Sequence, residues 1–190
     1  PGVRIAGPNN TGVLLDEQSA LCLSAAWACV RCIATDIAGI GLEVVQRMPD
    51  GSFRQAVEHR AYSLFKHSPD GNTTPMRSLQ AVMGHLLTYG QAYYGVDQYN
   101  DGTLALRLLD PRLVQVLYTT DKDVVYQVAG VDGLLTKDRI VHFGGLGWDG
   151  LTGYAPVSML KQALALAQVS ESYAASFLKN GSKASGILTS

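Results

Sequence analysis

The most informative stretch of the sequence is residues 149–188, which read DGLTGYAPVSMLKQALALAQVSESYAASFLKNGSKASGIL. Pro156 suits the first turn of a helix, and no helix breaker follows until Asn180-Gly181. The sequence therefore predicts one long helix over residues 155–180. This segment is rich in Ala, Ser, Leu and Gln and poor in charge. Such a composition favours a slim structural strut with close neighbours over a catalytic element.

The predicted helix carries an apolar stripe that repeats at three- and four-residue steps, with Glu171 in its middle. On a monomer Glu171 would be a solvated gap in the stripe. In a ring of subunits it could instead meet a basic residue of the next subunit. The stripe consists of Val157, Leu160, Leu164, Ala167, Ala174 and Leu178. The candidate subunit-interface residues are Lys161, Ala167, Gln168, Glu171, Ser172 and Lys179.

Upstream, the sequence predicts an irregular arm over residues 1–15 and a mixed region of helices and strands over residues 16–154. Short alternating runs between residues 92 and 143 are separated by turn signals and lack crossover helices, so they suit antiparallel hairpins or a meander. The expected fold class is α+β. Helices are expected over 16–39, 58–66 and 74–90, and a hairpin over 42–57 with its turn at Pro49-Asp50-Gly51. The first helix is expected to bury an apolar face of Cys22, Ala26, Cys29, Ile33 and Ile37.

The composition limits the classes of protein to which this chain can belong. Charged residues make up 16% of the 190 residues, below the roughly 25% of an average soluble domain. Depletion of charge is typical of the centre of an interface, so we expect an obligate oligomer or a piece of a larger body. The chain begins with Pro1, which we interpret as a sign of a fragment or a processed product. The net charge is -1 without a long run of one sign, which does not indicate tight non-specific DNA binding.

No apolar stretch reaches the ~20 residues that a membrane-spanning helix needs, so no membrane association is expected. All three cysteines fall in one predicted helix. This clustering argues against a disulfide framework and for a reducing compartment.

Two motifs open an enzymatic alternative. Residues 145–150, GLGWDG, match the glycine pattern of dinucleotide-binding loops, but five residues separate the motif from the predicted helix. Cys29 and Cys32 form a CxxC pair more than two turns inside a predicted helix, where buried structural cysteines are expected. His142 is expected to be a hydrogen-bonded sheet residue. We therefore assign no catalytic, cofactor-binding or metal-binding residue. The alternative is a small cytosolic nucleotide-binding or redox enzyme built on one of these two motifs.

Four further stretches of the sequence are informative together: SAAWACVRCIA leading to IAGIGL (24–42), LLTYGQAY (86–93), IVHF (140–143), and GLTGYAP (150–156) continuing through FLKNG (177–181) to SGIL (185–188). These four stretches resemble the portal (head-tail connector) proteins of tailed bacteriophages, in the Hong Kong phage type of that family. Together they span about residues 14–190 in the family's order. Gln91, Ala155 and Gly41 stand where the family usually has Asn, Ser and Pro, and each keeps the local turn or cap chemistry.

The resemblance implies a non-enzymatic subunit of a homo-oligomeric ring of about twelve copies at one capsid vertex. Double-stranded DNA would pass non-specifically through the ring during packaging and ejection. The implied partners are the large terminase subunit, head-tail adaptor proteins and the major capsid or scaffold protein. The implied location is the virion, and the host cytoplasm during assembly, for a phage or a prophage. No cofactor is implied.

The resemblance also divides the chain into an arm (1–15), a wing (16–154), a stem-like helix (155–180) and the start of a clip (181–190). Family members continue well beyond the equivalent of Leu188. The rest of the clip, a returning stem helix and a channel-lining loop are therefore expected to lie outside this sequence.

Overall fold

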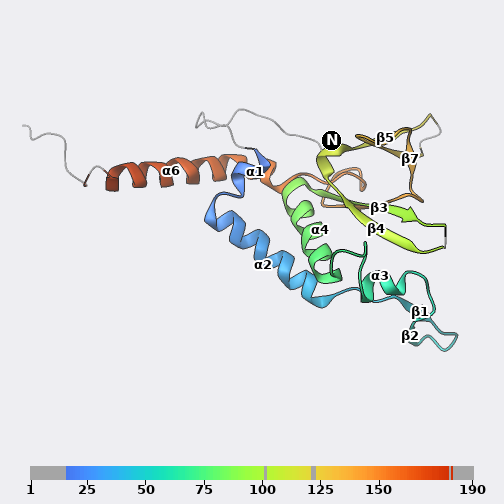
Figure 1. Cartoon of the computed structure of the whole chain (residues 1–190). Coiled ribbons are helices and arrows are strands. Elements are labelled where there is room, and N and C mark those ends of the chain that lie inside the picture. The colour runs from blue at the N-terminus through green and yellow to red at the C-terminus, as the bar shows by residue number, and fades with distance from the viewer. Residues whose placement is uncertain (1–15, 101, 121–122, 180, 182–190) are drawn as a thin grey trace, which may run out of the picture.

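The computed structural model describes residues 16–100, 102–120, 123–179 and 181. Its helices and antiparallel strands confirm the expected α+β class. Helices α2 (Ser24–Ile40) and α4 (Pro75–Tyr89) pack together beside the sheets, and α6 (Lys161–Lys179) projects away from the body (Figure 1). The predicted arm over residues 1–15 lies outside the described residues.

The first predicted helix is two helices. Asp16 caps α1 (Glu17–Ala20), because its side-chain Oδ1 accepts a 2.7 Å hydrogen bond from the Ser19 backbone N–H. The chain leaves the helical ladder after Ala20 and re-enters it at Ser24. Helix α2 then runs to Ile40 and ends at Gly41, whose φ of 74° favours glycine.

The expected buried face of α2 is wrong. Ala34 and Ala38 are buried, whereas Cys29, Ile33 and Ile37 are exposed. The alanines are one step away from the isoleucines on the helix surface, and their small side chains allow α2 to lie close to α4. Helical periodicity located an apolar face on α2, but this chain does not cover that face.

The expected hairpin is confirmed: β1 (Val45–Arg47) pairs antiparallel with β2 (Phe53–Gln55), with Gln46 opposite Arg54. Every residue of both strands is exposed. The helix that follows, α3 (Tyr62–Lys66), is shorter than the expected 58–66.

Helix α4 matches its predicted ends. Thr74 is the N-cap, its side chain accepting a hydrogen bond from the Arg77 backbone N–H, and Pro75 is the first helical residue. Gly90 ends the helix with a left-handed φ of 76° and turns the chain directly into the next strand.

The remaining strands form two three-stranded antiparallel sheets, of order β4-β3-β8 and β5-β6-β7. The expected meander describes β5 to β7, but the last strand returns to pair with β3, where Tyr93 lies opposite His142. The strands are β3 (Gln91–Gln98), β4 (Leu104–Leu109), β5 (Val114–Tyr118), β6 (Val124–Val128), β7 (Leu135–Thr136) and β8 (Ile140–Gly144), and a 3-10 helix spans Pro111–Leu113.

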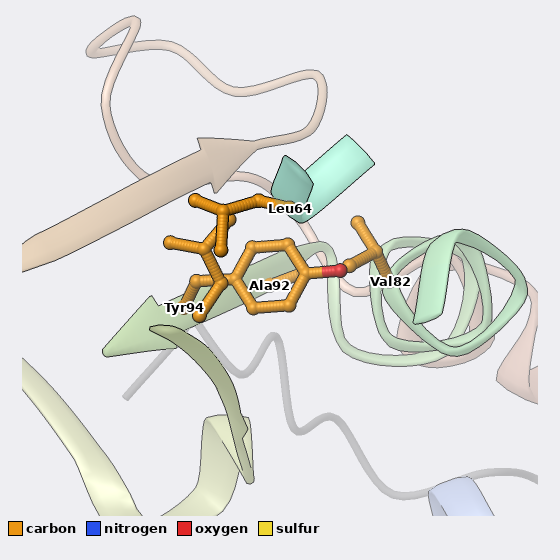
Figure 2. Close-up of a cluster of buried hydrophobic side chains, with 5 residues drawn as sticks. Leu64, Val82, Ala92 and Tyr94 are labelled. Carbon is orange, nitrogen blue, oxygen red and sulfur yellow. The ribbon is translucent and has the colours of Figure 1, made fainter. Parts of the chain in front are cut away.

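Strand β3 separates two hydrophobic cores, because successive side chains along a strand point to opposite faces of the sheet. Ala92 and Tyr94 join Val82 of α4, Leu64 of α3 and Leu106 in the first core. Figure 2 shows the Tyr94 ring pointing toward Val82, and the Tyr94 hydroxyl is hydrogen-bonded to Ser78. On the other face Tyr93 packs in a second core, whose other members are Val114, Tyr126, Val128 and Ile140.

The predicted long helix is interrupted near its start. Helix α5 (Pro156–Met159) ends at Leu160, whose ψ of 7° departs from helical geometry, and α6 begins at Lys161. A small cluster of Ala20, Val157 and Ala165 fixes the base of α6 to the body. From residue 169 to residue 179 every residue is exposed.

Candidate subunit interface

The glycine-rich segment after β8 sets the position from which α6 leaves the body. Gly145 donates its backbone N–H to the Gly90 carbonyl at 2.8 Å, and Tyr154 donates to the Leu146 carbonyl at 2.8 Å. A Cβ at Gly153 would lie 2.1 Å from the Gly90 carbonyl oxygen. These glycines are needed because three backbone segments approach more closely than any side chain allows.

Asp149 stabilises the outer turn of this segment. Its Oδ1 accepts hydrogen bonds from the backbone N–H groups of Leu151 (2.9 Å) and Thr152 (2.7 Å), and its Oδ2 accepts one from the Thr152 hydroxyl. The Thr152 hydroxyl and these N–H groups lower the pKa of Asp149 below its usual value. The Asp149 carboxylate therefore stabilises a turn of the backbone.

Neither enzymatic motif has the geometry that its chemistry requires. Helix α5 begins at Pro156 and not inside the loop over residues 145–150, and the described strands all pair antiparallel. Cys29 and Cys32 lie inside α2 and are exposed, so the expectation that they are buried is wrong. In the described part of the chain no three His, Cys, Asp or Glu side chains are grouped to hold a metal ion.

The buried side chains of His142 and Tyr93 contribute to the packing of the core. His142 stacks on Tyr93 with ring centroids 4.5 Å apart, and its Nδ1 lies 3.4 Å from the Tyr126 hydroxyl. The expectation of a hydrogen-bonded sheet histidine is therefore confirmed. Burial lowers the pKa of His142 and raises that of Tyr93, so both groups are neutral near pH 7. The Tyr93 hydroxyl also donates a hydrogen bond to the Gln91 Oε1 atom.

The candidate interface residues divide between two faces of α6, because a helix turns about 100° per residue. Ala167 and Glu171 are one turn apart on one face, and both are exposed. The other four share a second face: Lys161 and Gln168 are half-buried near the base, whereas Ser172 and Lys179 are exposed. The Gln168 Oε1 atom is buried without a hydrogen-bond partner.

The structure reveals an apolar surface that the sequence reading missed. Leu166, Val169, Tyr173 and Phe177, here called the α6 stripe, lie at steps of three, four and four residues and therefore share a third face of the helix. Their exposed fractions are 61%, 38%, 72% and 50%. The rings of Tyr173 and Phe177 stack with centroids 6.5 Å apart. The spacing of the α6 stripe is visible in the sequence, but the apolar stripe that was predicted from Val157 onward lies on a different face.

A second open apolar surface lies on α2. Cys29, Ile33, Ile37 and Ile40, here called the α2 stripe, follow at steps of four, four and three residues. The isoleucines are 45%, 42% and 79% exposed, and Cys29 is exposed as well. Two apolar helix faces of this size are unusual on a monomer and are typical of surfaces that bind a protein.

Among the described residues, no helix combines the length and the apolar character that crossing a membrane requires.

Comparisons with known proteins give a consistent match. A family model described as "Phage portal protein" matches residues 24–190. The portal protein of Enterobacteria phage HK97 is 26% identical over 184 residues, which cover 92% of this chain and 42% of that protein. A chain from the neck of an empty GTA particle has a TM-score of 0.71 at 17% identity, covering 99% of this chain and 55% of its own length.

An HK97-family phage portal protein from Corynebacterium diphtheriae has a TM-score of 0.58 at 15% identity over 92% of this chain and 52% of its own. At these identities the structural matches establish the fold. The chain spans about half the length of the relatives it matches.

Proposed function

The chain belongs to the phage portal protein family, and from this premise we propose that it is a structural subunit of a portal ring at one capsid vertex. Double-stranded DNA would pass through this ring during packaging and ejection. The subunit makes and breaks no bonds in this role; it acts by its shape and by association with copies of itself. Structurally similar GTA necks were computed with C6 and with C12 symmetry, and the second of these supports a ring of about twelve subunits.

The observation that carries the proposal is helix α6. Residues 169–179 are exposed along their whole length, including Tyr173 and Phe177. An isolated helix of this length is marginal in water, and most helices are stabilised by packing of an apolar face. Neighbouring subunits would supply that packing for α6.

The resemblance to the portal family supports a proposed division of the chain. Residues 16–154 form the wing, residues 155–180 form the first stem helix, and residues 181–190 begin the clip. In this arrangement the helix that projects from the body in Figure 1 is the part that lies among its neighbours around the channel.

Two faces of α6 would then meet between adjacent subunits. Glu171, next to Ala167, would face Lys161 or Lys179 of the neighbouring subunit, with Gln168 and Ser172 at the polar edge. Glu171 and Lys179 have no ion pair in the described part of one chain. Ala167 allows the two helices to approach closely.

The assembled ring would dock the large terminase subunit during packaging, and head-tail adaptor proteins would take that place later. The wing would contact the major capsid or scaffold protein. The location would be the capsid vertex of the virion, preceded by the host cytoplasm during assembly. A net charge of -1 suits a surface along which DNA slides without tight binding.

Electron micrographs of the full-length protein test this proposal, with rings around a central opening as the expected result. Ala167→Trp should prevent ring formation while the circular dichroism spectrum stays unchanged, because overpacking a close helix contact is costly. Ala167→Ser is the matched control and should form rings. A full-length protein that remains monomeric at all concentrations would contradict the proposal.

A further inference from the structure

We propose that the α6 stripe of one subunit packs antiparallel against the α2 stripe of the next subunit. The inference rests on the proposed portal ring and names the surfaces that close it. The occupant of each stripe is thus a second copy of this chain.

The α6 stripe is large enough to be a protein-binding surface. Aromatic side chains each contribute 150–250 Å² when they are covered, so the four exposed side chains leave on the order of 400 Å² of apolar surface open. That area is about half of what one partner contributes to a standard protein interface, and it is within the roughly 300–600 Å² of the largest apolar patch on a typical monomer, a patch that is often functional. The stripe contains no charged residue, so covering it leaves no unpaired charge buried.

The symmetry of a ring requires that the surface that covers the α6 stripe differ from the α6 stripe itself. In a ring of more than two copies each contact is head-to-tail, so two distinct complementary patches meet at every interface. The α6 stripe therefore cannot pair with itself around the ring. The α2 stripe is a long apolar helix face that is equally open in the single chain. In Figure 1, α2 and α6 leave the region of α1 in different directions, as two sides of one subunit should.

The spacings of the two stripes match when the helices run antiparallel. The α6 stripe advances by three, four and four residues, and the α2 stripe read backwards from Ile40 advances by three, four and four. Both spans equal about 16 Å at 1.5 Å per residue. The match in register is Leu166 with Ile40, Val169 with Ile37, Tyr173 with Ile33, and Phe177 with Cys29.

The sizes of the side chains are also complementary in two of the four pairs. The large Phe177 ring is opposite the small Cys29 thiol, and Val169 is opposite the longer Ile37. Alternation of large and small side chains lets facing helices interdigitate. Asp36 lies at the border of the α2 stripe, where its carboxylate, 3.7 Å from the Cys32 Sγ, would stay at the solvated rim.

Native Cys29 provides a direct test in the full-length protein. In a Cys22→Ser/Cys32→Ser background, Phe177→Cys is combined with Cys29 and the sample is treated with a short bismaleimide. We expect covalent dimers and a ladder of higher oligomers on a denaturing gel. Their yield should exceed by roughly tenfold that of Ala175→Cys, an exposed position on the opposite side of α6, because assembly raises the effective thiol concentration only on the paired face.

Two further variants fix the direction of packing. Leu166→Cys should not link to Cys29, because an antiparallel register places them at opposite ends. Leu166→Cys should link to Ile40→Cys in a background that also carries Cys29→Ser. These variants keep the test decisive if Phe177→Cys prevents assembly.

Electron micrographs of each variant separate the two proposals. Rings without the α6–α2 links, or links that stay at monomer mass, overturn this inference and leave the portal function intact. A link between Leu166→Cys and Cys29 overturns the antiparallel register. Absence of rings from every variant and from the parent overturns both proposals.

Discussion

The body around β3 and the helix α6 are opposite cases within one chain. In the body, Val82, Ala92 and Tyr94 are at most 4% exposed. Along α6, Tyr173 is 72% exposed and Phe177 is 50% exposed. The body covers its own apolar side chains, whereas α6 presents side chains of the same kind to whatever lies outside the chain. Apolar content alone therefore does not distinguish a core from an interface.

The two regions should also respond differently to mutation. Substitutions in the body change the free energy of unfolding of the single chain, because the native contacts are made within that chain. Substitutions on the outer part of α6 should change association and leave the free energy of unfolding nearly unchanged.

Gly90→Ala should destabilise the body by about 4 kcal/mol. Gly90 has φ 76°, and an added Cβ would lie 2.2 Å from the Tyr154 carbonyl oxygen, so the substitution forces apart the segment that anchors α6. Urea unfolding measures the change. Gly84→Ala in the same helix is the matched control: its Cβ would meet nothing within 4 Å, and it should stabilise the chain by about 0.5–1 kcal/mol. A small effect of Gly90→Ala would contradict the close backbone packing.

Leu64→Ala and Leu166→Ala compare the same substitution in the two regions. Leu64 is 4% exposed and Leu166 is 61% exposed. We expect a loss of about 3 kcal/mol at position 64 and less than about 0.5 kcal/mol at position 166, because only the first leaves a cavity. Chemical denaturation of the isolated chain decides between them. Equal losses at both positions would show that α6 folds against its own chain.

Tyr94→Phe should cost about 1 kcal/mol, because it removes the hydrogen bond to Ser78 and leaves that buried hydroxyl without this partner. Tyr173→Phe removes a hydroxyl from an exposed ring on α6 and should leave the unfolding midpoint unchanged. The comparison uses thermal or urea unfolding of both variants. A loss at Tyr173 equal to that at Tyr94 would contradict the assignment of Tyr173 to an open face.

The body should lose stability as the pH falls from 7.5 to 5.5. Burial lowers the pKa of His85 and of His142 below the usual 6.5. The unfolded chain therefore takes up protons near pH 6.5 that the folded chain does not, so the stability present above that pH declines toward the folded pKa values. The double variant His85→Gln/His142→Gln should flatten this dependence in urea titrations at both pH values. A profile as steep as that of the parent would rule out these histidines as the cause.

Local chemistry made much of the fold predictable. Thr74 and Pro75 at one end of α4 and Gly90 at the other are cap signals that act over a few residues, and Pro49-Asp50-Gly51 specifies its hairpin in the same way. The antiparallel pairing followed from the absence of crossover helices. The resemblance to the portal family was also visible in the sequence, because the motifs that carry it are short and occur in the family's order.

The helix that carries the candidate interface was predictable as well. The slim, charge-poor composition of residues 161–179 indicated a helix that contacts neighbours, and the structure places those residues on a projecting helix. The Leu166–Phe177 face was missed because several apolar spacings coexist in one helix and the sequence does not rank them.

What the sequence by itself determined is the set of elements, their ends and the presence of apolar faces on α2 and α6. Only the tertiary structure decided that Ala34 and Ala38, not Ile33 and Ile37, are buried, that β8 returns to β3, and that the glycines at 145 and 153 serve close backbone approach. The physical reason is that caps, turns and periodicity depend on neighbours a few residues away. Which surface covers an apolar face depends on contacts between segments distant in sequence or, in the proposed ring, between chains.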